Sequence, residues 1–123
     1  MKLHLTTAEK QNLITGYGDD FIEINRQRYQ HNLIVTPENI ISDWDCIGFT
    51  SLSTEHFAEI GLSKPEVVLL GSGATHRFLH PRIYAALTAQ GIPLECMNTA
   101  AACRTYNILM SEGRNVTALL CLT

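Results

Sequence analysis

The chain has 123 residues, of which 46% are hydrophobic and 17% are charged. This length predicts a single domain over residues 1–123, and the composition is that of a globular protein rather than a disordered one. Nine lysines and arginines oppose twelve aspartates and glutamates, a formal charge of −3, so the chain has no general electrostatic attraction to nucleic acid or to anionic membranes.

The amino-terminal half carries patterns of β structure. Residues 21–24 alternate apolar and polar side chains, as a half-buried strand does. The polar residues 25–27 predict a turn, and residues 28–35 predict a returning strand. These segments together predict an antiparallel hairpin, whose turn has neither Asn-Gly nor Asp-Gly to define its type.

A further strand and a short helix are expected next. Residues 40–49, which carry the only tryptophan, Trp44, predict a short strand. Ser53 is placed to cap a helix over residues 54–60, because its side-chain oxygen can accept from a free backbone N–H of the first turn. Gly61 is expected to end that helix.

The carboxyl-terminal half changes to continuous apolar runs. Residues 67–70 are apolar without alternation, which is typical of a strand covered on both faces. Pro81 and Gly91 bracket a predicted helix over residues 82–90, and residues 92–97 predict the next strand.

The last two elements complete an alternating unit. Asn98 or Thr99 is expected to cap a helix that runs to about residue 112, and residues 115–122 predict a third strand. The order strand–helix–strand–helix–strand implies right-handed crossovers and parallel strands, although the short loop before the last strand leaves its direction open. The predicted fold class is α/β: a mixed sheet with a parallel βαβ unit flanked by helices, plus the amino-terminal antiparallel β-hairpin.

A candidate ligand site follows from this topology, because the carboxyl ends of parallel strands share one edge of the sheet. The glycines of the loop after residue 70 let backbone N–H groups approach a ligand, and the helix near Thr99 offers the positive end of its dipole. Hydroxyl, amide and guanidinium groups complete a site for a small anion or a small metabolite. The candidate ligand-binding residues are Gly71, Ser72, Gly73, Asn98, Thr99, Arg104 and Asn107.

A simpler interpretation stands beside each part of this site. The loop completes neither a phosphate-binding loop nor a dinucleotide fingerprint, so Gly71 and Gly73 are also explained by a turn into the next helix. Arg104 and Asn107 share a helix face by their i, i+3 spacing. Either Arg104 is solvated and Asn107 is a local cap, or Arg104 folds back toward the edge while Asn107 holds a neighbouring loop.

Catalytic and metal patterns are incomplete. His76 and His80 are four residues apart, but a proline follows them directly and disfavours a shared helical face. Asp43 and Asp45 would share one strand face, as an acid–base pair or as a solvated surface. Cys103 near a helix start is either a buried apolar residue or a nucleophile with a lowered pKa. We therefore expect no metal and no cofactor. A non-enzymatic role is favoured, and the alternative, an enzyme that uses the candidate ligand site, stays open.

Targeting signals are also missing from the sequence. Residues 1–9 reach polar and acidic positions too early for a signal peptide, and they lack the repeated arginines of a transit peptide. The longest apolar runs are far shorter than a membrane span. We expect no membrane insertion and a cytoplasmic location.

Several motifs carry a family resemblance. They are the strand and glycine loop over residues 65–73, Pro81, the turn Met97-Asn98-Thr99, the helix Arg104-Thr105-Tyr106-Asn107 and the end Glu112-Gly113-Arg114. The chain thereby resembles the Mth938-like domain family of unknown function, whose relatives include mitochondrial complex I assembly factor 3 and the adipogenesis-associated Mth-like protein. Where this family is expected to have a glycine-containing turn, the chain has Asn25-Arg26-Gln27.

The resemblance implies a three-layer fold and a non-enzymatic protein-interaction module that assists assembly of a respiratory or membrane complex. It implies a protein partner without identifying it, and it leaves the oligomeric state open. The residues that the family motif marks in this chain are Gly71, Gly73, Thr99, Arg104, Tyr106 and Asn107.

Overall fold

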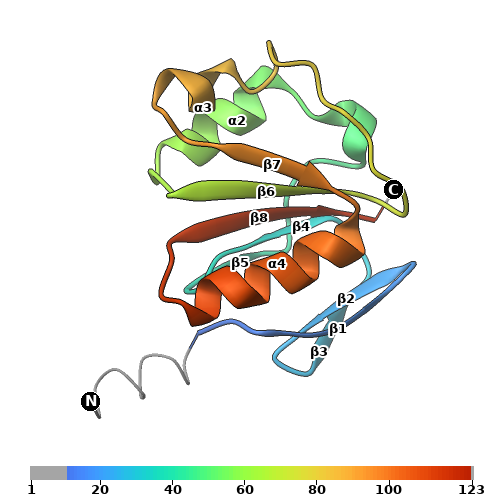
Figure 1. The fold of residues 1–123 in the computed structure, drawn as a ribbon. Helices are drawn as coiled ribbons and strands as arrows, with labels where there is room; N and C mark the ends of the chain where they lie inside the picture. Colours follow the sequence, from blue (N-terminus) through green and yellow to red (C-terminus); the bar gives the residue numbers. More distant parts are fainter. Residues whose placement is uncertain (1–10, 123) are drawn as a thin grey trace.

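The computed structural model describes residues 11–122, which form two β-sheets and the helices packed on them (Figure 1). The extreme amino-terminal residues, on which the prediction of location depends, lie outside this range. A three-stranded antiparallel sheet comes first in the chain and contains β1 (Ile14–Gly18), β2 (Phe21–Ile24) and β3 (Gln27–Tyr29).

The second sheet has five strands in the order β5-β4-β8-β6-β7. Its parallel part joins β6 to both β7 and β8, and β4 runs antiparallel to β8 and β5. The direction of the last strand, which the sequence left open, is therefore parallel to β6. The strands are β4 (Leu33–Val35), β5 (Ile40–Ile41), β6 (Val67–Ser72), β7 (Leu94–Met97) and β8 (Val116–Cys121).

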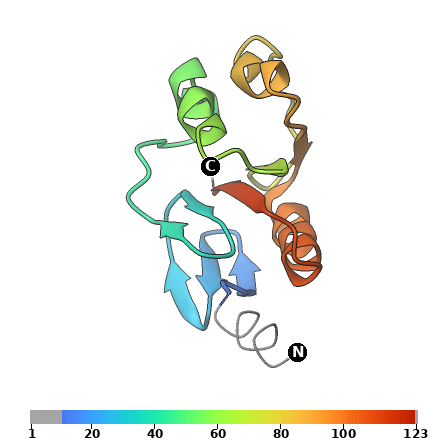
Figure 2. The same ribbon diagram turned by 90° about the vertical axis from the view of Figure 1, so that its left-hand side faces the viewer.

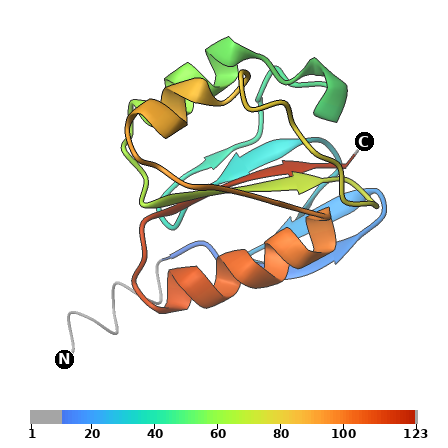
Figure 3. The ribbon, with the colours of Figure 1, turned by 45° about the horizontal axis from the view of Figure 1, so that its top comes forward.

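Helices cover both faces of the five-stranded sheet (Figure 3). α4 (Thr99–Ser111) and the small sheet pack on one face, while α2 (Thr54–Gly61) and α3 (Ala85–Ala89) pack on the other, with the 3₁₀ helix η1 (Phe49–Ser51) nearby. Figure 2 shows the same arrangement from the side, with α2 and α3 above the five-stranded sheet and the amino-terminal strands below it. These layers give the mixed α/β fold that the sequence predicts.

Two apolar cores result from the alternation of side chains along the central strands. Leu69 of β6 packs in the core with Tyr106 of α4, and its neighbour Leu70 packs in the core with Phe57 of α2. Every residue of β6 and β8 is buried because helices cover both faces. The continuous apolar runs predicted from the sequence are thus confirmed as central strands.

The structure corrects several predicted boundaries. Residues 28–35 are not one strand: they divide into β3 and β4, which lie in different sheets. The break is held by Asn32, whose amide donates to the Cys46 carbonyl (3.0 Å) and whose oxygen accepts from the Leu122 N–H (2.6 Å). β1 was not predicted.

Two further predicted elements are shorter than expected. Of residues 40–49 only β5 is a strand, and the predicted helix over residues 82–90 is reduced to α3. Helix α2, by contrast, begins after Ser53 and ends at Gly61 as predicted.

The turn between β2 and β3 has two residues with left-handed backbone angles. Asn25 has φ 54° and Arg26 has φ 72°, the signs that a type I′ hairpin turn requires. Asparagine tolerates this region, and its side-chain oxygen also accepts from the Leu13 N–H (3.0 Å). Arginine does not favour it, so the turn has the expected position without the expected glycine.

Candidate functional site

The carboxyl end of β6 is joined to the start of α4 and to β8 by a small set of close contacts. The Gly73 N–H donates to Thr99 Oγ1 (2.8 Å), and the Thr99 N–H donates to the Gly73 carbonyl (2.9 Å). The Thr99 hydroxyl in turn donates to the Cys121 carbonyl. A Cβ added at Gly71 would lie 2.9 Å from Thr99 Cα, so this glycine allows the strand and the helix to approach.

A pocket of about 300 Å³ opens beside this junction. The predicted site residues Gly73, Asn98 and Thr99 are in its wall, and the turn between β1 and β2 forms the opposite side. The remaining lining residues are Tyr17, Gly18, Asp19, Ala74, Ala100, Cys121 and Leu122. The structure therefore brings together three of the seven predicted residues at one concave surface.

The electrostatics of this pocket do not favour an anion. Of the residues described, no lysine or arginine lines it, and its one charged side chain is the carboxylate of Asp19. The Asn98 side chain accepts from the Ala101 N–H (2.8 Å), and the Thr99 N–H is held by Gly73. Donors of the first turn of α4 are therefore already bonded within the protein, which leaves the helix dipole a weak attraction for a ligand.

Ser72 faces away from this pocket, because it follows Leu70 on the face of the sheet that packs against α2. Its hydroxyl lies 2.7 Å from the Thr75 carbonyl oxygen and 3.1 Å from that of Met97, and it accepts from the Arg77 N–H (3.0 Å). The serine shapes the loop after β6 rather than lining the pocket.

Arg77 is engaged on that same face. Its Nε and Nη2 donate to the Ser72 carbonyl (3.0 and 2.7 Å), and its guanidinium carbon lies 4.5 Å from the ring centroid of Phe49. Phe49 belongs to the core under α2. Arg77 therefore connects η1 to the end of β6, and it does not line the pocket.

The polar residues of α4 hold the amino-terminal sheet. Asn107 accepts from the Ile14 N–H (3.0 Å) and donates to the Ile14 carbonyl (2.8 Å), so it pairs with β1 as a neighbouring strand would. The buried Tyr106 hydroxyl donates to the Asn12 carbonyl (2.8 Å), and Arg104 donates to the Tyr17 hydroxyl (2.9 Å). Asn107 thus holds a neighbouring segment of the chain, as one of the two hypotheses expected, and that segment is β1.

Arg104 does not fold back to the pocket as the sharper hypothesis expected. It is exposed and reaches sideways to Tyr17, which lines the pocket in its place. Arg104 and Ser72 belong to opposite faces of the five-stranded sheet, so the predicted convergence of all seven residues does not occur.

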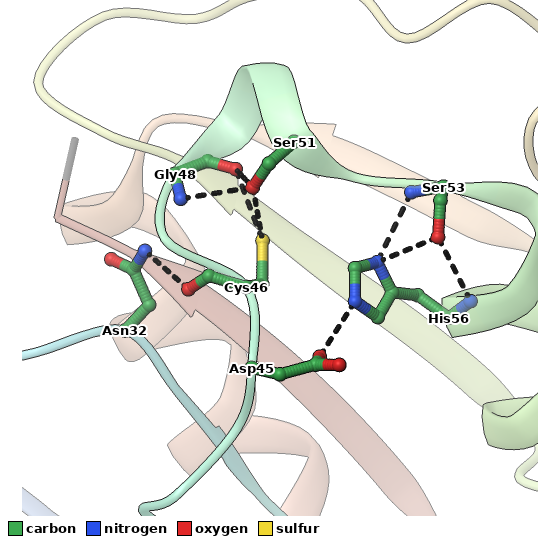
Figure 4. Close-up of polar contacts among 7 residues, drawn as sticks. All are labelled: Asn32, Asp45, Cys46, Gly48, Ser51, Ser53 and His56. Atoms are coloured by element: carbon green, nitrogen blue, oxygen red, sulfur yellow. Dashed lines mark hydrogen bonds and ion pairs between the residues drawn. The ribbon is translucent and has the colours of Figure 1, made fainter.

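A second polar cluster, missed from the sequence, lies at the start of α2 (Figure 4). The Ser53 N–H donates to His56 Nδ1 (3.1 Å), and the His56 N–H donates to Ser53 Oγ (3.4 Å). Because Nδ1 accepts, Nε2 carries the proton and donates to Asp45 (2.8 Å). This is a capping box with histidine in place of the usual glutamate, and the Ser-x-x-His spacing was its signal.

The predicted shared strand face of Asp43 and Asp45 is wrong, since both lie in the loop after β5, where they line one surface hollow. Cys103 is fully buried, and burial raises the pKa of its thiol to about 12, the opposite of what a nucleophile needs. Within residues 11–122 no three histidine, cysteine, aspartate or glutamate side chains are grouped to hold a metal ion, and no helix is long and apolar enough to cross a membrane.

The fold and the contacts of α4 define an α/β domain built on a mixed five-stranded sheet. The chain belongs to the family described as "Protein of unknown function (DUF498/DUF598)", whose model matches residues 14–121. A crystal structure of a protein from Bordetella parapertussis is similar, with 39% identity and a TM-score of 0.84, over 90% of this chain and 95% of that one.

Two other relatives link the chain to named proteins. The solution structure of a Bordetella pertussis protein described as a Mth938-like domain has 31% identity and a TM-score of 0.78, over 94% of this chain and 87% of that one. The mouse protein "NADH dehydrogenase [ubiquinone] 1 alpha subcomplex assembly factor 3" is 30% identical over 109 residues, which cover 87% of this chain and 58% of the relative. The chain thus spans under two thirds of that assembly factor, and the family resemblance is confirmed.

Proposed function

We propose that the chain is a non-enzymatic protein-interaction module that assists assembly of a respiratory or membrane complex. The observation that carries the proposal is the set of hydrogen bonds made by the polar residues that the family motif marks. Arg104, Tyr106 and Asn107 hold the amino-terminal sheet, and Thr99 joins β6 to β8. Hydrogen bonds used in this way stabilise a scaffold, as an interaction module requires.

The surface of the described residues supports the same proposal. Phe78, in the loop after β6, is 85% exposed, and Leu62, in the turn after α2, is 78% exposed. Large apolar side chains that remain in water lower the free energy of a complex when a partner covers them. The assembly-factor name of the mouse relative points to the kind of complex concerned.

The test is purification of the tagged chain from its own cells at native expression, together with a deletion strain. We expect a stable protein partner in stoichiometric amount, and a lower respiratory rate or membrane-complex content after deletion. Recovery of the lone chain, with unchanged respiration and membrane complexes in the deletion strain, would overturn the proposal.

A second candidate function rests on the pocket of about 300 Å³ beside Gly73 and Thr99. Its size suits a small metabolite, with specificity supplied by the Asn98 amide and the Asp19 carboxylate. Thermal-shift measurements with a panel of small neutral and cationic metabolites test it, since a ligand at 100 times its Kd adds about 2.7 kcal/mol to stability. We expect a gain that Ala100→Leu removes by filling the pocket. If none of these compounds stabilises the protein at millimolar concentration, the metabolite-binding function is rejected.

A further inference from the structure

A groove runs along α2, between this helix and the free edge of the five-stranded sheet at β5. It consists of two hollows, of about 390 Å³ and about 330 Å³. Both have Ile41 and Glu59 in their walls, so they join into one depression. The groove lies on the opposite face of the sheet from α4 and is separate from the pocket beside Thr99.

One end of the groove is apolar. Side chains of the sheet edge, Ile34 and Ile41, face Ile60 of α2 across it, whereas Ile40 packs on the opposite face of the sheet. Ile41 is 42% exposed, because β5 is the last strand of the sheet and none of the described strands pairs with its outer side. A partner that covers this end therefore buries aliphatic surface and meets an open strand edge.

The other end of the groove is acidic. Four of the twelve acidic residues of the chain line it around Trp44: Asp43, Asp45, Glu55 and Glu59. Asp45 is paired with His56, whereas the other ion pairs among residues 11–122 involve carboxylates outside the groove. Neither hollow is lined by a lysine or arginine among the residues described, so the negative charge of this end is not balanced within the groove.

The acidic and apolar ends lie in a fixed order along the helix. Glu55 and His56 belong to the acidic hollow, Glu59 to both, and Ile60 and Ser63 to the apolar one. Ser63 is eight positions after Glu55, in the turn that follows α2, and eight positions at the rise of a helix correspond to about 12 Å. An extended chain advances about 3.3 Å per residue, so a segment of roughly four residues spans the groove.

We infer that this groove binds a short basic segment of a partner protein, with an aliphatic side chain between Ile41 and Ile60 and a lysine or arginine beside Trp44. The occupant follows from charge complementarity: a cation at the acidic end lies beside Trp44 among four carboxylates, of which, within residues 11–122, only Asp45 is already paired, with His56. Acidic segments are repelled there. The inference rests on the proposed function, because it names the chemistry of the partner that an interaction module would take.

The hydrogen bond between His56 and Asp45 positions the acidic end of the groove. His56 is held by Ser53 on one side and donates to Asp45 on the other, which ties the loop that carries Trp44 to the start of α2 (Figure 4). The ring centroids of Trp44 and His56 are 5.5 Å apart in an edge-on arrangement. The acidic end is therefore built before a partner arrives, so little conformational entropy is lost on binding.

The test is selection of a phage-displayed random heptapeptide library on the full-length chain, followed by affinity measurement of synthetic versions of the enriched peptides. We expect the enriched peptides to combine an aliphatic residue with lysine or arginine, and to bind several-fold more weakly when salt rises from 50 to 500 mM. The double variant Asp43→Lys/Glu59→Lys should weaken binding at least tenfold, and Ile41→Asp should weaken it similarly from the apolar end.

The matched control is Asp20→Lys/Glu112→Lys, which makes the same change in net charge at exposed positions that line neither hollow. The control should keep affinity within twofold, and thermal melting should show that all variants are folded. Absence of enriched peptides, enrichment of peptides without basic residues, or equal binding by the groove and control variants would each overturn the inference.

The same variants separate this inference from the proposed function. A partner purified with the chain that binds the control normally but binds Asp43→Lys/Glu59→Lys at least tenfold more weakly supports both. A partner that binds the groove variant and the control equally leaves the interaction function standing and rejects the groove as its site.

Discussion

The pair of hydrogen bonds between Asn107 and Ile14 gives a direct test of how α4 holds the amino-terminal sheet. The Asn107 side chain satisfies both backbone groups of Ile14, at 3.0 and 2.8 Å. Ile14 is 5% exposed, so water has little access to these groups in the folded protein. Substitution of Asn107 by alanine would leave both backbone groups without a partner.

The expected loss follows from the cost of burying unsatisfied backbone groups. Each costs about 1–3 kcal/mol, and the half-buried position of Asn107 lets water reach part of the gap, so we expect Asn107→Ala to lower the free energy of unfolding by about 2–4 kcal/mol. The neighbouring Ile108 is 58% exposed, and Ile108→Ala should change stability by less than about 0.5 kcal/mol.

Urea denaturation of the wild type and both variants measures these differences, with an unchanged slope indicating that the denatured state is the same. Hydrogen exchange supplies a local readout, because the Ile14 amide should exchange faster in Asn107→Ala than in the wild type. A loss below about 0.5 kcal/mol, with the Ile14 amide still protected, would refute the reasoning that this asparagine replaces a strand partner.

Three further predictions test the turn, the close approach at β6 and the pH dependence. Arg26→Gly should stabilise the protein by about 1 kcal/mol in thermal melting, because glycine accepts the left-handed angle at no steric cost; a lower melting temperature would contradict this. Gly71→Ala should destabilise by about 1–3 kcal/mol in urea, since its Cβ would meet the backbone of α4; an unchanged midpoint would contradict the close approach. The Asn115 N–H and the Arg114 guanidinium hold the pKa of Glu66 below its ordinary value, so the stability that Glu66 adds over Glu66→Gln should be present above about pH 4.3 and vanish as pH falls through the lower folded-state pKa; urea titrations from pH 7 to pH 3 that show a constant difference would refute it.

The elements that could be predicted from the sequence are those whose signals are local. Helix α2 is bounded by Ser53 and Gly61, and the apolar runs within β6 and β8 are typical of strands covered on both faces. β1 was missed because Gly16 and Gly18 interrupt its apolar pattern and a register shift lies between Ile14 and Gly16. Periodicity alone could not divide residues 28–35 between two sheets, since the break depends on tertiary hydrogen bonds of Asn32.

The candidate site was predictable only as far as topology determines it. Parallel strands bring Gly73 and Thr99 to one edge, and the structure places them in hydrogen-bond contact. The directions of Ser72 and Arg104 depend on which face of the sheet each side chain occupies and on where the small sheet packs. The capping role of His56 was missed because histidine is not the residue usually expected three positions after a capping serine.

The position of β8 has a consequence for how the protein is made. β8 is the last strand of the described chain, yet it lies in the middle of the sheet, between β4 and β6. During synthesis on the ribosome, β4 and β6 emerge first and must wait with their inner edges unpaired until residue 121 has left the exit tunnel. β4 and β6 therefore lack their central partner until translation has passed β8, and this interval is when a chaperone would protect the chain from aggregation.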